Sequence, residues 1–347
     1  MFQTLVCNPV FSGDVIKFGL QANLAAERAV FALYQARRPE NTRRAQRAAL
    51  ALFAEFMRSH NVATGELFAE PNAWQGITWG LVQGFQDWML GNGYCVKTIN
   101  DRVSVVKVYM NLAHQAGIIP DAEIIRLRGL RGFTCKESID TDLKRARQGL
   151  ATRRGTKKQR ATHLSEEQAR KLKNGQPDTP QGRRDTLLMC LLLDHGLRVS
   201  EVVSLAVENF ELEKHQVTFY RTKTGRTSKH NLRGRAWQCL VEYLEHDQHS
   251  PTGPLLLAST KSGALVPGSG LTVRAANERV KVLGMSAGVE GLSPHDCRHY
   301  GATKAGHDSN VSLAALMAWG GWESPTSAAR YIDRGQADND GVSLGME

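Results

Sequence analysis

Apolar residues recur at helical spacing in the first third of the chain. Leu50, Phe53 and Phe56 lie on one predicted helix face, and Asn41 or Thr42 stands where a helix N-cap is expected. Similar spacing predicts a second and a third helix joined by short loops. The three helices begin near Thr42, Leu81 and Lys97 and reach Phe56, Met89 and Tyr109. This segment is therefore expected to form a compact helical domain.

The second half of the chain alternates between helical spacing and short strand-like runs. Ser165 and Gln168 form a capping-box pattern at the start of a helix, and an apolar helix over 186–193 ends before a glycine. Two alternating runs flank the tight Thr224-Gly225 turn, which is typical of an antiparallel hairpin. Strands are expected at 209–212, 216–222 and 227–232, and further helices at 236–245, 273–283, 294–305, 313–318 and 326–332. The pattern predicts a mostly α domain with one small antiparallel β-sheet.

Basic residues crowd together between the two predicted domains. Eight lysines and arginines fall between Lys144 and Arg160, together with Gly149 and Gly155. Because like charges repel, this block is not expected to pack as a core. It is either a solvated, flexible linker or a strap along DNA phosphates, and one segment can be both. The predicted organisation is an N-terminal arm (1–30), a helical domain (31–135), a basic linker (136–164), a second domain (165–334) and a C-terminal tail (335–347).

The overall charge favours a polyanionic partner. The 347 residues include 44 Lys and Arg against 34 Asp and Glu, a formal net charge of +10, and neutralising phosphates releases condensed counterions. A basic protein without a nucleic-acid role is the alternative at this point. The sequence has no apolar run of about 18 residues and no signal-peptide pattern at its start. A soluble, cytoplasmic protein without a membrane partner is expected.

Neither a metal nor an organic cofactor is expected. The six cysteines are too far apart in the sequence to form a metal-ligand pair, and reduced thiols fit a cytoplasmic protein. The chain contains no Walker loop and no dinucleotide-binding glycine pattern. Any catalysis is therefore expected to come from side chains alone.

Five local signals carry candidate chemistry, and the first two are single basic residues. Arg198 lies in the segment GLRVSE (196–201) at a helix boundary, where it can simply pair with Glu201. Lys223 lies in RTKTG (221–225), just before the hairpin turn, where a solvated lysine is common. Only a larger set of residues makes either one a functional candidate.

The third signal is the segment SPHDCRH (293–299). Ser293 suits the N-cap, Pro294 the first helical position, and Asp296 completes a capping pattern. His295 and Arg298 then share one face near the first turn, where free backbone N–H groups and the helix dipole favour an anion. The arrangement predicts a phosphate cradle, and a capped helix with a surface histidine is the alternative.

The fourth and fifth signals are aromatic. Trp322 ends the segment WGGW (319–322), which usually marks a tight turn under packed rings, although its indole N–H can also donate to a phosphate oxygen. Tyr331 follows nine residues later in AARYI (328–332). Most tyrosines are amphipathic packing residues. Tyr331 is therefore a candidate nucleophile only in combination with the other four signals.

In order, the five signals resemble the catalytic set of the tyrosine recombinase (phage integrase) family. The resemblance rests on Gly-Leu-Arg-x-x-Glu, a hairpin lysine, His-x-x-Arg, Gly-Trp and a tyrosine nine residues later, and it spans about 165–334. The 41–117 segment is similar to the family's helical core-binding domain. The commonest family pattern has histidine where this chain has Trp322. Tryptophan there, the Gly-Gly-Trp turn, the Tyr-Ile pair and the segment VKTI (96–99) resemble the Cre recombinase branch.

The resemblance implies cleavage and rejoining of DNA through a 3′-phosphotyrosyl intermediate. It also implies two domains, one core-binding and one catalytic, that close as a C-shaped clamp around the duplex. Arg198 and Arg298 are expected to grip the scissile phosphate through their planar donor forks, and Trp322 to add one donor. Glu201 is expected to position Arg198.

The remaining candidates handle the proton transfers. Tyr331, with an ordinary pKa of about 10, is expected to attack with help from His295 as base or proton relay. Lys223 is expected to protonate the departing 5′ oxygen, and His299 follows the motif as a less certain member. Because the phosphotyrosyl linkage conserves phosphodiester energy, neither ATP nor a metal is implied.

Polar residues on the first and third predicted helices are the DNA-binding candidates. They suit contacts with the major groove and phosphates, and ordinary exposed charge is the alternative for each. The candidates are Arg43, Arg44, Arg47, Lys97, Thr98 and Arg102. The resemblance further implies a double-stranded DNA recognition site, a homotetramer on two paired sites, and a monomer or weak dimer off DNA. It also implies a tail (335–347) that docks on a neighbouring protomer.

Two other functions stay open from the sequence. A type IB topoisomerase shares the tyrosine, arginine and lysine chemistry, but that class generally has lysine at the His295 position and relaxes supercoils without pairing two sites. A non-catalytic DNA-binding regulator is the other, and the intact set from Arg198 to Tyr331 argues against decay. The predicted function is site-specific recombination, as integration, excision or resolution, by a nucleoid-associated protein of bacterial, phage or mobile-element origin.

Overall fold

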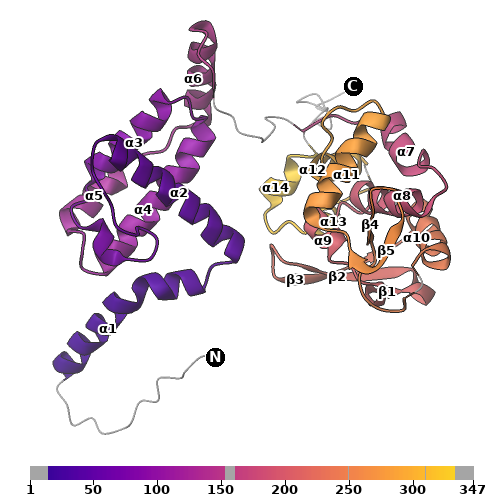
Figure 1. The fold of residues 1–347 in the computed structure, drawn as a ribbon, viewed down its shortest axis with the longest axis horizontal. Helices are drawn as coiled ribbons and strands as arrows, with labels where there is room; N and C mark the ends of the chain where they lie inside the picture. The colour runs from indigo at the N-terminus through magenta and orange to yellow at the C-terminus, as the bar shows by residue number, and fades with distance from the viewer. Residues whose placement is uncertain (1–14, 153–160, 249, 309, 333–347) are drawn as a thin grey trace, which may run out of the picture. The chain divides into compact units, whose positions relative to one another are not determined.

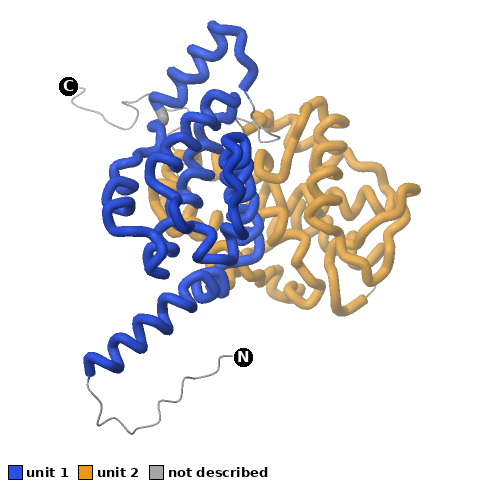
Figure 2. The backbone as a smooth tube through the Cα atoms, turned by 60° about the vertical axis from the view of Figure 1, so that its left-hand side comes forward, with its two compact units in different colours: residues 1–157 blue, residues 158–347 orange. Residues whose placement is uncertain are grey.

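The chain folds into two compact units, Met1–Lys157 (unit 1) and Lys158–Glu347 (unit 2) (Figure 2). The structure is a computed structural model that describes residues 15–152, 161–248, 250–308 and 310–332. Within these ranges the chain is mostly helical, with small antiparallel sheets (Figure 1). The predicted fold class is confirmed, and the structure adds a second small sheet. Among the described helices, none combines the length and the apolar character that a bilayer crossing requires.

Helices make up the described part of unit 1. They are α1 (Val15–Ala36), α2 (Glu40–Ser59), α3 (Trp79–Gly91), α4 (Val96–Gln115), α5 (Asp121–Gly129) and α6 (Cys135–Arg147), with the short 3₁₀ helix η1 (Pro71–Trp74). Helix α4 contacts α1, α2, α3, α5 and η1. It is therefore the central element of the unit.

The ends of the predicted helices shift by a few residues. Helix α2 begins at Glu40 with Pro39 at its N-cap, and not at the expected Asn41 or Thr42. Proline has no N–H to leave unsatisfied there, and the carboxylate of Glu40 interacts favourably with the positive end of the helix dipole. Thr78 caps α3, because its side chain accepts a backbone N–H of the first turn.

Aromatic rings fill the core of unit 1. Phe53 stacks on Trp74 with ring centroids 6.2 Å apart and meets the Phe85 ring edge-on at 5.1 Å. The Tyr109 ring also stacks on Trp74, with ring centroids 6.2 Å apart. All four side chains are buried, and they come from α2, η1, α3 and α4. The apolar face read from the sequence around Phe53 is therefore the packing face.

Helix α1 covers part of the segment expected as an N-terminal arm. Phe31, near its C-terminal end, is buried and meets the Tyr109 ring edge-on at 5.5 Å. Val15, Ile16 and Phe18, at its other end, are exposed, and Figure 1 shows α1 reaching away from the other helices of unit 1. Only the C-terminal part of α1 is thus anchored in the core of its unit.

Helix α6 extends into the segment expected as a flexible basic linker. Arg145, one of the eight basic residues of that block, is buried. Its guanidinium donates to the carbonyl of Tyr94 at 3.0 Å and to that of Leu90 at 2.5 Å, close to the end of α3. The expectation of a solvated, flexible block is thus wrong for Arg145, whereas Lys144 and Arg147 of the same helix are exposed. Residues 153–160 of the block lie outside the described residues.

Arg145→Ala is expected to destabilise unit 1 by roughly 2 kcal/mol, because two backbone carbonyls lose a charged donor. Urea denaturation measures the loss, and faster amide exchange within α6 locates it. The matched control is Arg147→Ala, which removes an exposed arginine from the same helix and is expected to cost less than about 0.5 kcal/mol. Equal losses in both variants would mean that Arg145 does not anchor α6.

Unit 2 combines helices with two small sheets. Its helices are α7 (Glu166–Asn174), α8 (Pro180–Leu193), α9 (Val199–Val203), α10 (Arg235–His246), α11 (Val273–Ser286), α12 (Pro294–Gly306), α13 (Leu313–Gly320) and α14 (Pro325–Ala329). One antiparallel sheet has the order β1 (Phe210–Glu211), β2 (Gln216–Arg221), β3 (Arg226–Asn231), and the other pairs β4 (Leu257–Ser259) with β5 (Leu265–Gly270). Short 3₁₀ helices flank β1 at Val207–Asn209 and Leu212–Lys214.

Helix α8 is the centre of unit 2 and contacts α7, α9, α10 and α12. It begins at Pro180, capped by Thr179, and is therefore longer than the helix predicted over 186–193. Its first turns contain a fully buried pair, Arg184 with Asp185, at 2.7 Å. Because both residues are charged, the apolar pattern in the sequence did not include them in the predicted helix. Charged residues thus form part of this core.

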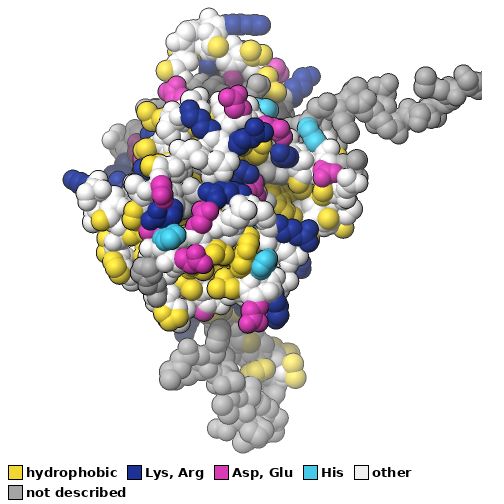
Figure 3. All heavy atoms as spheres, turned by 90° about the vertical axis from the view of Figure 1, so that its right-hand side faces the viewer, with side chains coloured by type: hydrophobic (Ala, Val, Ile, Leu, Met, Phe, Trp, Pro, Cys, Tyr) yellow, Lys and Arg dark blue, Asp and Glu magenta, His cyan; other side chains and the backbone are white. Residues whose placement is uncertain are grey.

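Surface charge is mixed on the face of the molecule shown in Figure 3. Basic, acidic and apolar side chains are interspersed there, with no large patch of one kind. The net charge of +10 is therefore not gathered on this face.

Candidate active site

Arg198 is fixed at the N-cap of α9 by one carboxylate. Its backbone N–H donates to Glu201 Oε2 at 2.8 Å, and its Nη1 donates to Glu201 Oε1 at 2.7 Å. Glu201 is 1% exposed, whereas the Arg198 side chain is 22% exposed. Glu201 therefore positions Arg198, as the sequence predicted, while part of the guanidinium still faces solvent.

Arg298 lies on α12, which starts as its sequence predicts. Ser293 is the N-cap, Pro294 follows, and Asp296 completes the capping box. Arg298 is 5% exposed and donates through Nη1 to the Gly196 carbonyl and through Nη2 to the Gly320 carbonyl. These two bonds fix the plane of the guanidinium.

The surroundings of Arg298 are predominantly cationic. Burial is the main reason that the pKa of Arg298 falls to about 10; Arg198 and Arg221 lower it further, while Glu201 and Tyr331 oppose the fall. The group is still charged at neutral pH. A site with more guanidiniums than carboxylates is suited to an anion.

Tyr331 is connected to Arg298 through the ring of Trp322. The Arg298 Cζ is 4.8 Å from the ring centroid of Trp322, and the Trp322 and Tyr331 centroids are 5.1 Å apart. The His299 ring meets Tyr331 edge-on at 5.0 Å. Helix α14 ends at Ala329, earlier than the predicted helix, so Tyr331 lies in the turn that follows. A turn leaves its phenol only partly buried.

Lys223 and His295 are not among these contacts. Lys223 is exposed in the turn that joins β2 to β3, and His295 is exposed in the first turn of α12. Neither side chain forms a hydrogen bond or an ion pair with the residues that the structure describes. The expected pairing of His295 with Arg298 on one face is thus only partial, because Arg298 is buried. Arg298, Trp322 and Tyr331 are in contact, and Arg198 is near enough to Arg298 to lower its pKa.

A third arginine of the site, Arg221, was not predicted. It is 1% exposed, and its Nη1 lies 3.4 Å from Glu201 Oε2, so that Glu201 holds two arginines. Burial lowers the pKa of Arg221, and nearby Arg198 lowers it further. The signal was present in the alternation of β2, in which Val217, Phe219 and Arg221 all point inward.

Two histidines, the buried His195 and the half-buried His230, lie behind the arginines. His230 Nε2 lies 3.2 Å from Arg221 Nη2, and because a guanidinium only donates, that nitrogen accepts. Burial, together with nearby His195, Arg221 and Arg298, lowers the pKa of His230 to about 3. Burial also lowers the pKa of His195, whose ring lies 5.8 Å from that of His230. Both imidazoles are therefore neutral at pH 7 and add no charge to the site.

Gly196 is required by a close approach as well as by its backbone angle. Its φ is +57°, and a Cβ there would overlap the indole of Trp319. The glycine of the Gly-Leu-Arg motif therefore lets Trp319 pack under the loop that leads to Arg198. The same loop supplies the carbonyl that Arg298 binds.

Gly196→Ala is expected to lower the free energy of unfolding by about 3 kcal/mol, from left-handed strain plus overpacking. The control is Gly288→Ala, with φ +76° and nothing within 4 Å of the added Cβ, which is expected to cost only about 1 kcal/mol. Urea titrations compare the two. An equal cost would mean that Trp319 moves aside freely.

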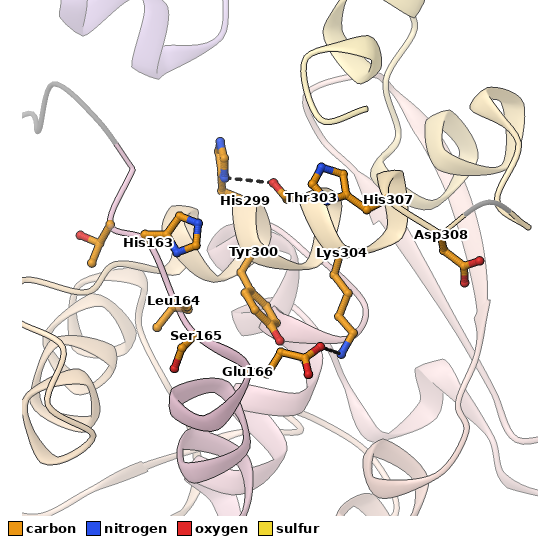
Figure 4. Close-up of a pocket in the computed structure, with 11 residues that line it drawn as sticks. His163, Leu164, Ser165, Glu166, His299, Tyr300, Thr303, Lys304, His307 and Asp308 are labelled. Carbon is orange, nitrogen blue, oxygen red and sulfur yellow. Dashed lines mark hydrogen bonds and ion pairs between the residues drawn. The ribbon is translucent and has the colours of Figure 1, made fainter. Parts of the chain in front are cut away.

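A pocket of about 530 Å³ opens along α12 (Figure 4). Its walls come from α12 and from the 162–166 segment that leads into α7. His299 Nδ1 lies 3.4 Å from Thr303 Oγ1, and Lys304 pairs with Glu166 at 2.7 Å. None of the six candidate catalytic residues lines it. Through His299 the pocket adjoins Tyr331, but it is distinct from the arginine cluster.

The described ranges contain no group of three or more His, Cys, Asp or Glu side chains that could hold a metal ion. The arrangement offers a guanidinium, an indole and a phenol in contact, with a second guanidinium nearby. Such a set can bind a phosphate and bring a hydroxyl to it.

Comparisons with known proteins identify a family over the part of the chain that contains these residues. The sequence matches the phage integrase family over residues 125–337. It is 28% identical over 207 residues to tyrosine recombinase XerC of Actinobacillus succinogenes, covering 58% of this chain and 66% of that protein. It is 32% identical over 146 residues to tyrosine recombinase XerD of Neisseria meningitidis, covering 41% and 48%. The chain thus spans at most two thirds of these relatives.

Solved structures share the fold. The Tn1549 transposon integrase in complex with transposon right end DNA superposes with a TM-score of 0.61 at 14% identity, covering 90% of this chain and 95% of that one. A lambda integrase dimer bound to a COC′ core site gives 0.58 at 12% identity, covering 97% and 85%. Since the family match extends over more than half of the chain and includes every candidate catalytic residue, this protein belongs to the phage integrase family.

Proposed function

We propose that this protein is a site-specific DNA recombinase that cuts and rejoins DNA strands with Tyr331 as nucleophile. Family membership supports the proposal, and one observation carries it: Arg298 contacts Trp322, which contacts Tyr331. The six proposed catalytic residues are Arg198, Lys223, His295, Arg298, Trp322 and Tyr331. The proposed catalytic domain is 165–334, and the proposed DNA-binding domain is 31–135.

The first task of the site is to hold the scissile phosphate and neutralise its charge. In this proposal Arg198 and Arg298 donate to the two non-bridging oxygens, and the Trp322 indole N–H adds a donor. Arg298 is already oriented by two backbone carbonyls, and Arg198 by Glu201. Preorganised donors cost little reorganisation as negative charge develops in the transition state.

The second task is proton transfer. The Tyr331 oxygen attacks phosphorus and gives its proton to His295, while the bond from phosphorus to the 5′ oxygen breaks and that oxygen takes a proton from Lys223. The products are a 3′-phosphotyrosyl bond and a free 5′-hydroxyl. Attack by a 5′-hydroxyl from a second duplex reverses these transfers and completes the exchange. The exposed positions of Lys223 and His295 suit groups that meet DNA from outside.

Unit 1 is proposed to hold the DNA duplex through α2 and α4. Arg44 is exposed, Arg47 lies over the Phe68 ring at 4.5 Å, and Lys97 is within 3.5 Å of Asp101. Arg102 donates to the Ala45 carbonyl at 3.0 Å and so joins the two helices. Arg43, Arg44, Arg47, Lys97, Thr98 and Arg102 stay the proposed contacts, and Arg102 also has a structural role.

Within the family we propose the Cre-like branch. Trp322 at a position where histidine is commonest, and the segment VKTI at 96–99, support it. The proposed assembly is a homotetramer on two paired sites, with a monomer or weak dimer off DNA. The C-shaped clamp stays a prediction, and so does docking of the tail, since 335–347 lies outside the described residues.

The test is covalent trapping. Purified protein is incubated with fragmented total DNA of the source organism, and DNA that stays attached after denaturation is sequenced. The proposal predicts a recurrent sequence joined through its 3′ phosphate to the peptide that contains Tyr331. Attachment to another residue, or none at all, would overturn it.

A plasmid assay separates recombination from relaxation. Plasmids that carry two copies of the trapped site are expected to recombine, and a plasmid without it is expected to keep its supercoils. Relaxation that needs no paired sites would indicate a type IB topoisomerase. Stable binding without cleavage would indicate a regulator.

A further inference from the structure

We propose that Arg221 is a positioning residue for DNA cleavage: it anchors the 319–321 turn and thereby holds Trp322 against Arg298 and Tyr331. The inference rests on the proposed recombinase function and assigns a residue outside the six proposed catalytic ones. Arg221 is not proposed to touch DNA, since it is 1% exposed.

Arg221 connects the β2–β3 hairpin to the turn that precedes Trp322. On the hairpin side, its Nε donates to Ser228 Oγ at 2.7 Å, and its Cζ lies 4.7 Å from the Phe219 ring centroid. On the other side, Nη2 donates to the Trp319 carbonyl at 2.8 Å and Nη1 to the Gly320 carbonyl at 3.4 Å. The guanidinium thus spans segments about one hundred residues apart in the sequence.

The turn packs closely against Arg221. Gly321 has φ +61°, and a Cβ on it would overlap the Arg221 side chain. A Cβ on Gly320 would overlap the Trp322 ring instead. The two glycines thus lie between the Arg221 side chain and the Trp322 indole, so a shift of Arg221 is expected to move Trp322.

The Gly320 carbonyl is shared by two arginines. Arg298 donates to it through Nη2, and Arg221 through Nη1. Glu201 is shared in the same way by Arg198 and Arg221. Arg221 therefore contacts the partners of both proposed phosphate-binding arginines and links them into one network.

A pocket of about 400 Å³ lies between the hairpin and the turn. Arg221, Thr224 and Lys229 line it from the hairpin, and Gly321 and Trp322 line it from the turn. Since packing between the two segments is incomplete there, the hydrogen bonds of Arg221 are a main direct connection between them. This is why its loss is expected to be felt at Trp322.

The alternative is that Arg221 only stabilises the fold. Arg184 provides the matched control, because it is equally buried at 1% and bonds to Asp185 and the Leu257 carbonyl in the core. Arg184→Lys has no route to Trp322. Both variants are expected to lower the melting temperature.

The experiment uses the full chain and a nicked duplex of the trapped site. Single-turnover rate constants for adduct formation are measured at saturating protein, where the constant does not depend on the fraction of protein that is active. Arg221→Lys is expected to react roughly 100-fold more slowly, since small displacements near a reacting centre cost about this much. Its affinity for DNA and the rate constant of Arg184→Lys are expected to stay near those of the wild type.

A double-mutant cycle tests the route through Trp322. Arg221→Lys combined with Trp322→Ala is expected to react no more slowly than the slower single variant, because both remove the same donor. A second substrate carries sulfur in place of the leaving 5′ oxygen, which makes protonation by Lys223 unnecessary. It is expected to rescue Lys223→Ala and not Arg221→Lys.

Each outcome bears on the proposal. A wild-type rate for Arg221→Lys, a product of two independent losses in the double variant, or rescue by the sulfur substrate would overturn the positioning role while the recombinase function stands. If the wild-type protein forms no phosphotyrosyl adduct, the proposed function fails and the role of Arg221 fails with it.

Discussion

Tyr331→Phe is expected to abolish covalent attachment to DNA while leaving DNA binding unchanged. The substitution removes only the phenol oxygen, which is the proposed nucleophile, and a phenylalanine ring can keep the contacts with Trp322 and His299. Loss of a nucleophile typically costs more than about 10,000-fold in rate. Denaturing gels that detect protein bound to labelled DNA measure the adduct, and gel shifts measure binding.

The matched control is Tyr300→Phe. Tyr300 lies on α12 and lines the pocket of Figure 4, which none of the cluster arginines lines, so this variant is expected to cleave normally. An adduct that persists in Tyr331→Phe would place the nucleophile on another residue, and peptide mapping would identify it. Loss of the adduct in Tyr300→Phe would mean that the pocket contributes to cleavage.

Arg298→Lys is expected to slow cleavage by at least about 1,000-fold, although the formal charge is kept. A lysine cannot donate to the Gly196 and Gly320 carbonyls and a phosphate at once in one plane, as the guanidinium can. The loss of one preorganised donor typically costs 100- to 1,000-fold, roughly, and here the Trp322 contact changes as well. Single-turnover cleavage measures the effect.

The same variant has an expected pH dependence. Burial and two neighbouring arginines lower the pKa of residue 298, and a lysine starts from a lower ordinary pKa than an arginine. The lysine ammonium is therefore expected to lose its proton at a lower pH than a free lysine does, so its residual activity falls faster with rising pH than that of the wild type. Arg235→Lys, whose partner Glu242 an ammonium can still bind, is the control. A wild-type rate for Arg298→Lys would refute the phosphate-binding role.

Local signals in the sequence predicted those parts of the fold that depend on neighbouring residues. The capping boxes at Ser165 and Ser293 form as their spacing indicates, and the β2–β3 hairpin turns at Gly225, whose φ is +66°. Each of these features is determined by hydrogen bonds within a few residues, so tertiary packing does not override it.

Features that depend on distant partners could not be predicted. The first turns of α8 contain the Arg184–Asp185 pair, which Arg279 completes at 2.5 Å from another helix. Arg145 is buried because its guanidinium donates to the carbonyls of Leu90 and Tyr94, which lie more than 50 residues earlier in the chain. A charged residue in a sequence carries no mark of the partner it will meet, so neither the earlier start of α8 nor the burial of Arg145 was predicted.

The candidate site also contains residues that could be predicted from the sequence and residues that could not. The motif spacing singled out the residues that the structure brings into contact around Arg298, since the resemblance contained the order of the set. It did not single out Arg221, His195 or His230, because the motif does not include them and their roles depend on burial. Only the alternation of β2 suggested an inward-facing arginine.

Glu201 is the one described carboxylate that pairs with the arginines of this cluster, and Arg198 and Arg221 share it. Without DNA, three guanidiniums therefore repel one another around a single counter-charge, and the resting protein stores an unfavourable interaction energy. In the proposed function a bound phosphate supplies the missing anion, so DNA binding is expected to stabilise this region. The melting temperature is then expected to rise with the concentration of the bound duplex, by mass action.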